Sequence, residues 1–195
     1  AKDFYNTGVT LNNTVSFSKA TDNMNIRLSY GNVDVKGLIP TSSLKKNTFN
    51  AITSIDLNKH FTVAANINYI TQKTVGEFDD GYSNQTTGSF NQWFHRDLDM
   101  NIMRELKDLK TPDGIYASWN HLNPDVYDPT NPRQFFAGNY WYNFYTWFDL
   151  VKQYSNFDRL YGDVSLTYKI TNDLRIKGTY RKQQNNTWGE TKFAS

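Results

Sequence analysis

Apolar and polar residues alternate along six stretches of this chain. In residues 160–170, for example, Leu160 and Val164 fall on one side of an extended backbone, and Asp163 and Lys169 fall on the other. A period of two residues is typical of a β-strand whose two faces meet different surroundings. We predict strands near residues 8–18, 24–31, 48–57, 61–72, 158–170 and 174–184.

These stretches are long, and their polar sides carry charge. Strands of soluble proteins usually have about 5–6 residues, whereas a tilted strand that crosses a bilayer needs about 9–11. Charged side chains are unfavourable in the core of a soluble sandwich but suit a water-filled lumen. The sequence therefore predicts an all-β fold, an antiparallel up-and-down transmembrane β-barrel segment. Closed bacterial barrels have at least about eight strands, so we expect further strands outside this chain.

The predicted connections alternate between short and long. The short ones are polar and rich in residues that tolerate turn geometry: 21–23, 58–60 and 171–173. Outer-membrane barrels keep short turns on the periplasmic side and long loops outside the cell. We therefore expect residues 31–47 and 73–156 to be extracellular loops, and residues 1–195 to be part of a single barrel domain.

The loop predicted for residues 73–156 is too long to lack structure of its own. Leu98, Ile102, Leu106 and Leu109 recur at helical spacing, with Met103 beside them. This spacing predicts a short helix that ends at Thr111-Pro112 and packs its apolar side against the core of the loop.

Aromatic residues are frequent in the same loop, and their rings suit stacking on sugars or contact with peptide side chains. The alternative roles are a girdle at the membrane interface or the core of the folded loop. The candidate substrate-binding residues are Trp93, Trp119, Tyr140 and Trp141. Phe148, Tyr154 and Phe157 lie where the chain re-enters the predicted bilayer, and we expect them in the girdle.

Composition narrows the function further. The net charge of +2 is too small to indicate nucleic-acid binding, and the absence of cysteine excludes disulfides and thiolate metal sites. The mean hydropathy of −0.70 excludes spanning helices but not spanning strands. The three histidines and the loop carboxylates lack the spacing of zinc or EF-hand sites. We find no catalytic group and expect no enzyme activity, metal or cofactor.

Four segments near the start of the chain resemble one transporter family when they are taken in order. They are residues 4–12 with 15–18, residues 25–30 (Asn-Ile-Arg-Leu-Ser-Tyr), residues 36–40 (Lys-Gly-Leu-Ile-Pro) and residues 47–50 (Asn-Thr-Phe-Asn). This order resembles the SusC/RagA branch of the TonB-dependent outer-membrane transporters of Bacteroidota. The large extracellular loop of that family is similar to residues 90–93, 96–109, 118–120 and 139–141. The family often has Asn-Pro-Tyr-Trp where this chain has Gly138-Asn139-Tyr140-Trp141.

The resemblance implies a bacterial outer-membrane barrel of about 22 strands, closed by an N-terminal plug. It implies a SusD-like surface lipoprotein as a lid, contacted by loops such as the predicted helix. It also implies import of a glycan or peptide, driven by TonB–ExbB–ExbD through an N-terminal part that this chain lacks. The barrel would be surrounded by the lipid bilayer and lipopolysaccharide. The residues expected to face the lumen, bracing the plug or meeting cargo, are Arg27, Asn66, Asn68, Arg159, Asp163, Lys169 and Arg175.

Two other kinds of protein are compatible with part of this pattern. One is a SusC-like barrel that serves as a structural scaffold subunit in a larger outer-membrane assembly, without transport. The other is a soluble β carbohydrate-binding module, in which aromatic rings on a sheet hold sugars. The long apolar sides of the predicted strands argue against the soluble module.

Overall fold

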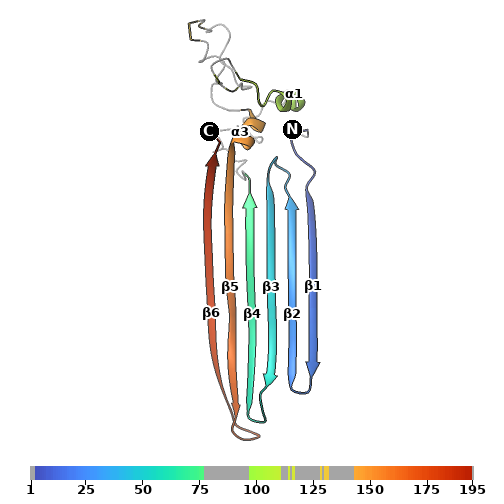
Figure 1. Cartoon of the computed structure of the whole chain (residues 1–195), viewed down its shortest axis with the longest axis vertical. Coiled ribbons are helices and arrows are strands. Elements are labelled where there is room, and N and C mark those ends of the chain that lie inside the picture. Colours follow the sequence, from blue (N-terminus) through green and yellow to red (C-terminus); the bar gives the residue numbers. More distant parts are fainter. Residues whose placement is uncertain are drawn as a thin grey trace.

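A computed structural model describes residues 3–76, 97–110, 114, 116, 128, 130–131 and 143–194. Its main element is one six-stranded antiparallel sheet in the order β1-β2-β3-β4-β5-β6, so that every strand pairs with its neighbours in sequence. The described part of the chain is therefore an all-β up-and-down meander with short helices at one end (Figure 1). The strands are β1 (Val9–Thr21), β2 (Met24–Lys36), β3 (Ser43–Asp56), β4 (Phe61–Val75), β5 (Val151–Lys169) and β6 (Arg175–Phe193). The helices are α1 (Met100–Glu105) and α3 (Phe144–Leu150).

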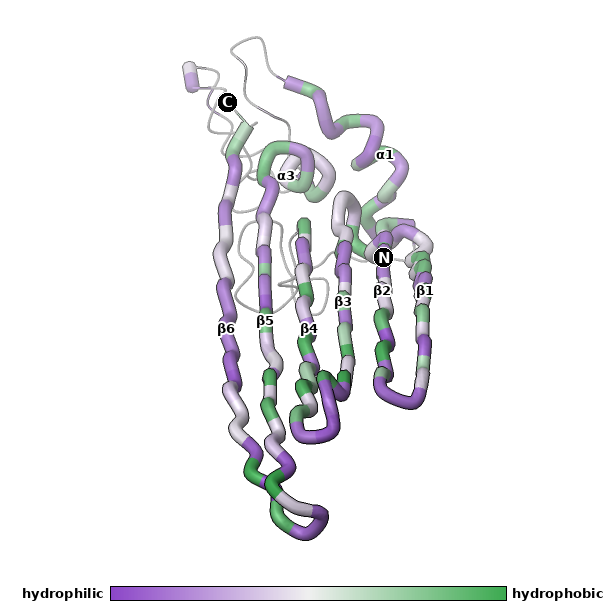
Figure 2. Tube along the Cα trace, turned by 60° about the horizontal axis from the view of Figure 1, so that its bottom comes forward, coloured by the Kyte–Doolittle hydropathy of each residue, from purple (hydrophilic) through white to green (hydrophobic). Residues whose placement is uncertain are grey.

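The pairing register brings the apolar sides of all six strands onto one face of the sheet. Val15 pairs with Tyr30, Tyr30 with Phe49, Phe49 with Tyr69, and Tyr69 with Leu160. Because paired residues in an antiparallel sheet point to the same side, the alternation seen in each strand adds up across the sheet. In Figure 2, hydrophobic positions are frequent in the half of the sheet that carries the tight turns.

The strands extend further toward the helices than the alternation predicts. The predicted loop 31–47 contains the ends of β2 and β3, and only residues 37–42 connect them. The connection between β4 and β5 is likewise shorter than the predicted 73–156, and β6 runs to Phe193 instead of 184. These extensions are mostly polar, and in β2 the alternation changes side, because Val33 and Val35 lie on the face opposite Tyr30. The hydrophobic period of the strands therefore does not continue into them, and the backbone ladder does.

The tight turns at the other end are held by their own polar side chains. The Asn58 Oδ1 atom accepts hydrogen bonds from the backbone N–H groups of His60 (2.8 Å) and Phe61 (3.0 Å). The Thr171 Oγ1 atom accepts from the backbone N–H group of Leu174 (3.1 Å) in the turn between β5 and β6. Such local bonds favour turns over continued strand, as the sequence predicts for these positions.

The connection 37–42 folds back onto the end of the sheet. The backbone N–H of Gly37 donates to the Ser42 carbonyl (2.9 Å), and the Ser42 hydroxyl donates to the Ile39 carbonyl (2.6 Å). Gly76, at the end of β4, has φ +124 and lies so close to Ser42 that a Cβ atom would come within 2.7 Å of the serine Cβ. Only glycine fits this backbone and this approach. The Lys-Gly-Leu-Ile-Pro segment is thus a packed corner beside β4.

The helices differ from the prediction. The predicted helix is present but short, because it begins after the cap residue Asp99 and ends at Glu105. The predicted apolar side was wrong, since Ile102 is 52% exposed and the buried side chains of α1 are Met100 and Met103. Helix α3 was not predicted, because its seven residues give too few turns for a recognisable helical period.

Candidate functional site

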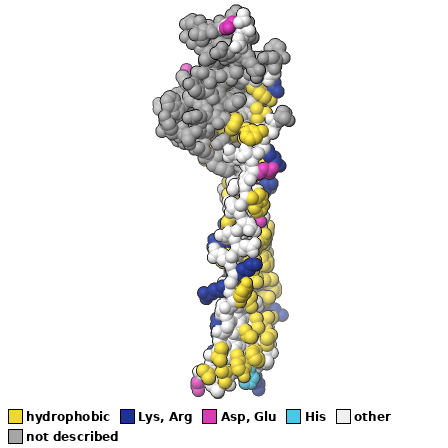
Figure 3. Space-filling view, turned by 90° about the vertical axis from the view of Figure 1, so that its left-hand side faces the viewer, with side chains coloured by type: hydrophobic (Ala, Val, Ile, Leu, Met, Phe, Trp, Pro, Cys, Tyr) yellow, Lys and Arg dark blue, Asp and Glu magenta, His cyan; other side chains and the backbone are white. Residues whose placement is uncertain are grey.

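One face of the sheet carries a band of exposed apolar side chains, which we call the apolar band. On β1, β5 and β6 the apolar band includes six side chains that are between 45% and 71% exposed: Val15, Phe17, Val164, Leu166, Ile176 and Tyr180. Seen from the β6 edge, hydrophobic side chains gather along one side of the lower part of the sheet (Figure 3). An apolar surface of this extent on a folded protein indicates contact with lipid or with another protein.

The apolar band crosses the strands obliquely. Its continuous run of exposed apolar residues spans positions 9–17 on β1 but 174–180 at β6, with midpoints at Asn13 and Lys177. Trp188 is 50% exposed on the same face, but Lys182, Gln184 and Asn186 separate it from this run. Following the register from Asn13 across the sheet leads to Asn186 on β6. The nine residues from 177 to 186 correspond to about 30 Å along the strand, while the five steps between strands cover about 24 Å. The band is therefore inclined by about 50°, close to the tilt of roughly 35–45° in membrane barrels.

Aromatic rings mark both ends of the apolar band on the central strands. Tyr30, Phe49 and Tyr69 are neighbours in register at the end nearer the helices. Phe61 and Tyr168 stack with ring centroids 4.8 Å apart at the end nearer the turns. The hydroxyl of Tyr30 donates to Asn47 Oδ1 at 2.8 Å, and Asn47 lies on the same face one pair nearer the helices, so the polar tip of the ring points toward the polar end of this face. Rings of this kind favour the interface between an apolar layer and water.

The opposite face of the sheet is polar, and we call it the polar face. All the residues that the sequence predicted to face a lumen lie on it: Arg27, Asn66, Asn68, Arg159, Asp163, Lys169 and Arg175. Asn68 accepts a hydrogen bond from Asn50 Nδ2 (2.5 Å) and donates to Asn66 Oδ1 (3.2 Å). Arg27 lies apart from the others, on β2. The polar face is thus lined by amide and charged groups that water or a polar partner can solvate.

Positive charge is concentrated on the polar face of the β5–β6 hairpin. The five basic side chains there are Arg159, Lys169, Arg175, Lys177 and Arg181, and Asp163 is the only acidic one. None of the five forms an ion pair with another residue that the structure describes. The guanidinium of Arg159 instead lies 4.7 Å from the ring centroid of Tyr161. The alternation of the sixth predicted strand already places Lys177 on the side of Arg175, although the list of expected lumen residues omitted it. Arg181 was not predicted, but it continues the same alternation and could have been found by it.

At the helix end, six side chains form a small apolar core that we call the loop-end cluster. They are Phe4, Met100, Met103, Phe144, Tyr145 and Phe148. Phe4 and Phe144 are 1% and 0% exposed, and their ring centroids are 5.8 Å apart. Phe148 is buried here and not in a membrane girdle, so that prediction was wrong. Its place on α3 rather than on a strand explains the difference.

Polar contacts join the helices of the loop-end cluster to each other and to the chain start. Asn143 caps α3 by accepting from the backbone N–H of Tyr145 (3.0 Å), and its Nδ2 donates to the Met103 carbonyl of α1 (2.8 Å). Arg104 Nη2 donates to the Asp3 carbonyl and to the Tyr145 hydroxyl, each at 3.1 Å. The start of the chain, α1 and α3 therefore form one packed unit above the sheet.

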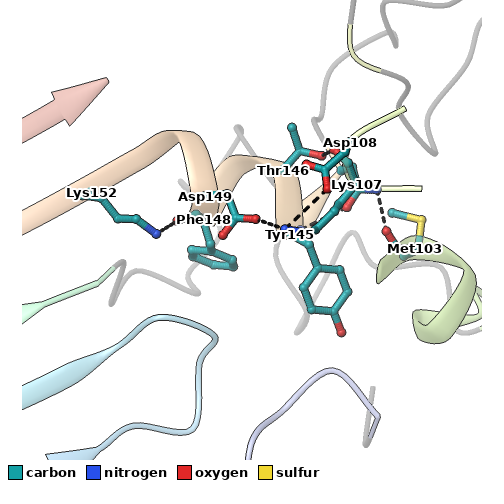
Figure 4. Close-up of polar contacts among 9 residues, drawn as sticks. Met103, Lys107, Asp108, Tyr145, Thr146, Phe148, Asp149 and Lys152 are labelled. Atoms are coloured by element: carbon teal, nitrogen blue, oxygen red, sulfur yellow. Dashed lines mark hydrogen bonds and ion pairs between the residues drawn. The ribbon is translucent and has the colours of Figure 1, made fainter. Parts of the chain in front are cut away.

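An ion pair adds to this unit. The ammonium group of Lys107 donates to the carboxylate of Asp149, and the Thr146 hydroxyl donates to the Lys107 carbonyl (Figure 4). The hydrogen bond that Lys107 donates to Asp149 is the main cause that raises the pKa of Lys107 above its ordinary 10.5, and attraction by Asp149 and Asp108 adds to it. The charged form of Lys107 is therefore favoured in the folded protein.

We expect this ion pair to stabilise the loop-end cluster at neutral pH and to stop doing so at high pH. A raised pKa contributes stability that is complete below the unfolded pKa and is lost as the pH rises through the folded pKa. The thermal midpoint of the wild type should exceed that of Lys107→Gln at about pH 8, and the difference should shrink by about pH 11.5. The other lysines and the tyrosines titrate in both proteins, so their effect cancels in the difference between the two thermal midpoints. A difference that does not change with pH would exclude the Lys107 charge as its source.

The structure does not describe the four candidate substrate-binding residues. Trp93, Trp119, Tyr140 and Trp141 all lie outside the described residues, so their prediction stays a prediction. Of the other residues assigned to the girdle, Phe157 lies on the polar face opposite Gln72, so its assignment to a lipid-facing girdle was wrong. Tyr154 lies between two ammonium groups, those of Lys73 and Lys192, at 5.5 and 5.3 Å from its ring centroid.

In the described part of the connection between α1 and α3, the carboxylate of Asp128 accepts hydrogen bonds from a residue two positions later in the chain. Asp128 accepts from the Thr130 hydroxyl (2.6 Å) and from the Thr130 backbone N–H (2.8 Å), and these bonds lower its pKa. Among the described residues, no three His, Asp or Glu side chains are grouped to hold a metal ion. No helix in the described ranges is long and apolar enough to cross a membrane.

Comparisons with known proteins do not assign a family. No family model matches the chain, and no curated protein has a significant match to it. Function is therefore inferred from the geometry of the sheet and from the sequence motifs.

Proposed function

We propose that this chain is part of the wall of a β-barrel in a bacterial outer membrane, with the apolar band facing lipid. The observation that carries the proposal is the oblique course of the band across six paired strands, opposite a polar face. A flat bilayer requires an apolar belt perpendicular to its normal, and tilted strands cross such a belt obliquely.

In a soluble protein, the apolar band would have to be covered by another part of the protein instead of by lipid. Val15, Tyr180 and Ile176 are 71%, 70% and 60% exposed, whereas the core side chains of a soluble sandwich are buried. Each large apolar side chain that is moved from water to an apolar environment gains about 1.5–3 kcal/mol. The lipid environment therefore favours this sheet strongly, and we prefer it to the soluble carbohydrate-binding module.

The edges of the sheet require further strands. Each of the outer strands, β1 and β6, has one neighbour in the described sheet. In a hydrocarbon layer, each unpaired backbone group costs several kcal/mol, and only a closed barrel satisfies them all. The proposal therefore includes strands outside this chain that pair with β1 and β6.

We infer from the sequence motifs that this barrel is a SusC-like, TonB-dependent transporter that imports a glycan or a peptide. The polar face would line the plugged lumen, where carboxylates of a plug or a cargo can pair with Arg175, Lys177 and Arg181. The loop-end cluster would be extracellular, beside a SusD-like lipoprotein lid. Cargo would be captured between the lid and the loops and would enter when TonB displaces the plug.

Extraction of the native outer membrane with detergent tests this proposal. The chain should be recovered within a parent of about a thousand residues or fewer, a length set by about 22 strands and a plug, together with a surface lipoprotein. Mass spectrometry identifies both. Import of the cargo should stop when TonB is deleted, whereas a scaffold subunit would keep its phenotype. Recovery in the aqueous fraction without detergent would contradict the barrel itself.

A further inference from the structure

A hollow interrupts the apolar band on β5. Ile67 of β4, Gly162 of β5 and Lys182 of β6 are successive partners across the sheet, so they share one face. The hollow measures about 140 Å³, and Leu160, Val164 and Tyr180 line it together with these three residues. Because glycine has no side chain, the backbone at position 162 forms the floor between the larger neighbours.

The glycine at this position is required by the close approach of two strands. A Cβ atom on Gly162 would lie 3.0 Å from Ile67 Cα and still closer to the backbone oxygen of Asn66. Any larger residue would push β4 and β5 apart, so the gap in the band cannot be filled from position 162. The hollow is therefore a permanent feature of this face.

Lys182 places a positive charge at the edge of the hollow. It directly follows Tyr180 among the residues of β6 that lie on the apolar face, so it marks the end of the apolar band on this strand. No ion pair joins it to another described residue. By contrast, Lys45 and Lys192, on the same face but further along, pair with Asp34 (3.4 Å) and Glu190 (3.5 Å). An unpaired cation beside an apolar surface favours an anion that carries its own apolar part.

We propose that the hollow holds one acyl chain of an anionic membrane lipid, whose phosphate pairs with Lys182. The acyl chain of the lipid lies over Gly162 between Ile67 and Val164, and the lipid headgroup lies at the level where the apolar band ends on β6. Tyr180 provides a wall whose polar tip can reach the headgroup region. The proposal rests on the lipid-facing role of this face, and it adds a defined lipid site where the apolar band ends on β6, on the side of the band nearer the helices.

Native mass spectrometry of the complete outer-membrane protein in detergent tests the site. The probes are dioleoyl phosphatidylglycerol, which is anionic, and dioleoyl phosphatidylcholine, which has no net charge. The wild type should retain one phosphatidylglycerol more tightly than phosphatidylcholine. Lys182→Gln should weaken phosphatidylglycerol binding about tenfold and remove the preference, as expected for the loss of one charge-assisted contact.

Two matched pairs of variants separate this site from general effects. Val164→Trp fills the hollow and should release both lipids, whereas Leu166→Trp, the next lipid-side position on β5, should release neither. Lys192→Gln should behave as the wild type, because that lysine is already paired with Glu190. Equal binding of both lipids by the wild type, or unchanged binding in Val164→Trp, would overturn the site. These results would leave the barrel intact, whereas a protein that stays in water without detergent would overturn the barrel.

Discussion

Replacing Ala65 by arginine should strongly lower the free energy of unfolding of the barrel in lipid, whereas the same replacement at Ala64 should be tolerated. The two alanines are neighbours on β4 and point to opposite faces. Ala65 pairs with Thr53 and Val164 in the apolar band, near the middle of its course on this strand. An arginine facing lipid at the bilayer midplane costs about 2–4 kcal/mol in a membrane barrel.

Ala64 is a close control because the residue type, the substitution and the strand are the same. It pairs with Ser54 and Ser165 on the polar face, where an arginine meets water or polar side chains. Ala64 is half-buried and Ser165 is buried, but a long arginine side chain can extend from this position along the polar face, so we expect its cost to be below that at Ala65. Guanidinium titration of the complete protein in lipid vesicles, followed by tryptophan fluorescence, measures both free energies of unfolding.

Equal effects of the two arginines would contradict the assignment of lipid and lumen to the two faces. A larger effect at Ala64 would reverse it. If both variants were as stable as the wild type, the sheet would not be in a bilayer. The comparison therefore tests the proposed membrane orientation without any knowledge of the cargo.

The sequence predicted those parts of the strands in which apolar and polar residues alternate. The stretch of β5 from Leu160 to Tyr168 alternates apolar and polar residues, and it was predicted within two residues of its turn-side end. The other end of β5, beginning at Val151, alternates poorly because both faces are polar there. Its strand conformation depends on pairing with β6 as far as Phe193, which is not visible in either segment alone.

The same reasoning explains the outcome at the candidate site. The polar face follows from alternation, so Arg27, Asn66 and Asp163 fall together on it as the register requires. The loop-end cluster does not follow from any local period, because Phe4 meets Phe144 across almost the whole chain. Such a contact depends on the strand order that brings both ends of the connection together, and a single sequence carries no signal for it.

Replacing Phe144 by alanine should release the loop-end cluster while the sheet stays paired. Phe144 is 0% exposed and packs against Phe4, and truncation of a buried phenylalanine costs about 3–5 kcal/mol. The cavity would remove the ring contact that holds the start of the chain and would loosen α1 and α3. The strands should be unaffected because their ladders do not depend on this core.

Hydrogen exchange of the complete protein in detergent, followed by mass spectrometry, measures this uncoupling. Peptides from residues 3–8, 100–105 and 144–150 should exchange faster in Phe144→Ala, while peptides from β4 keep their protection. Phe193→Ala is the control, because that ring is 70% exposed and its loss removes little packing. Faster exchange along β4 would show that the cluster also supports the sheet. Unchanged exchange in α1 would show that Asn143 and Arg104 hold the helices without the aromatic core, and that this end of the protein is joined mainly by polar contacts.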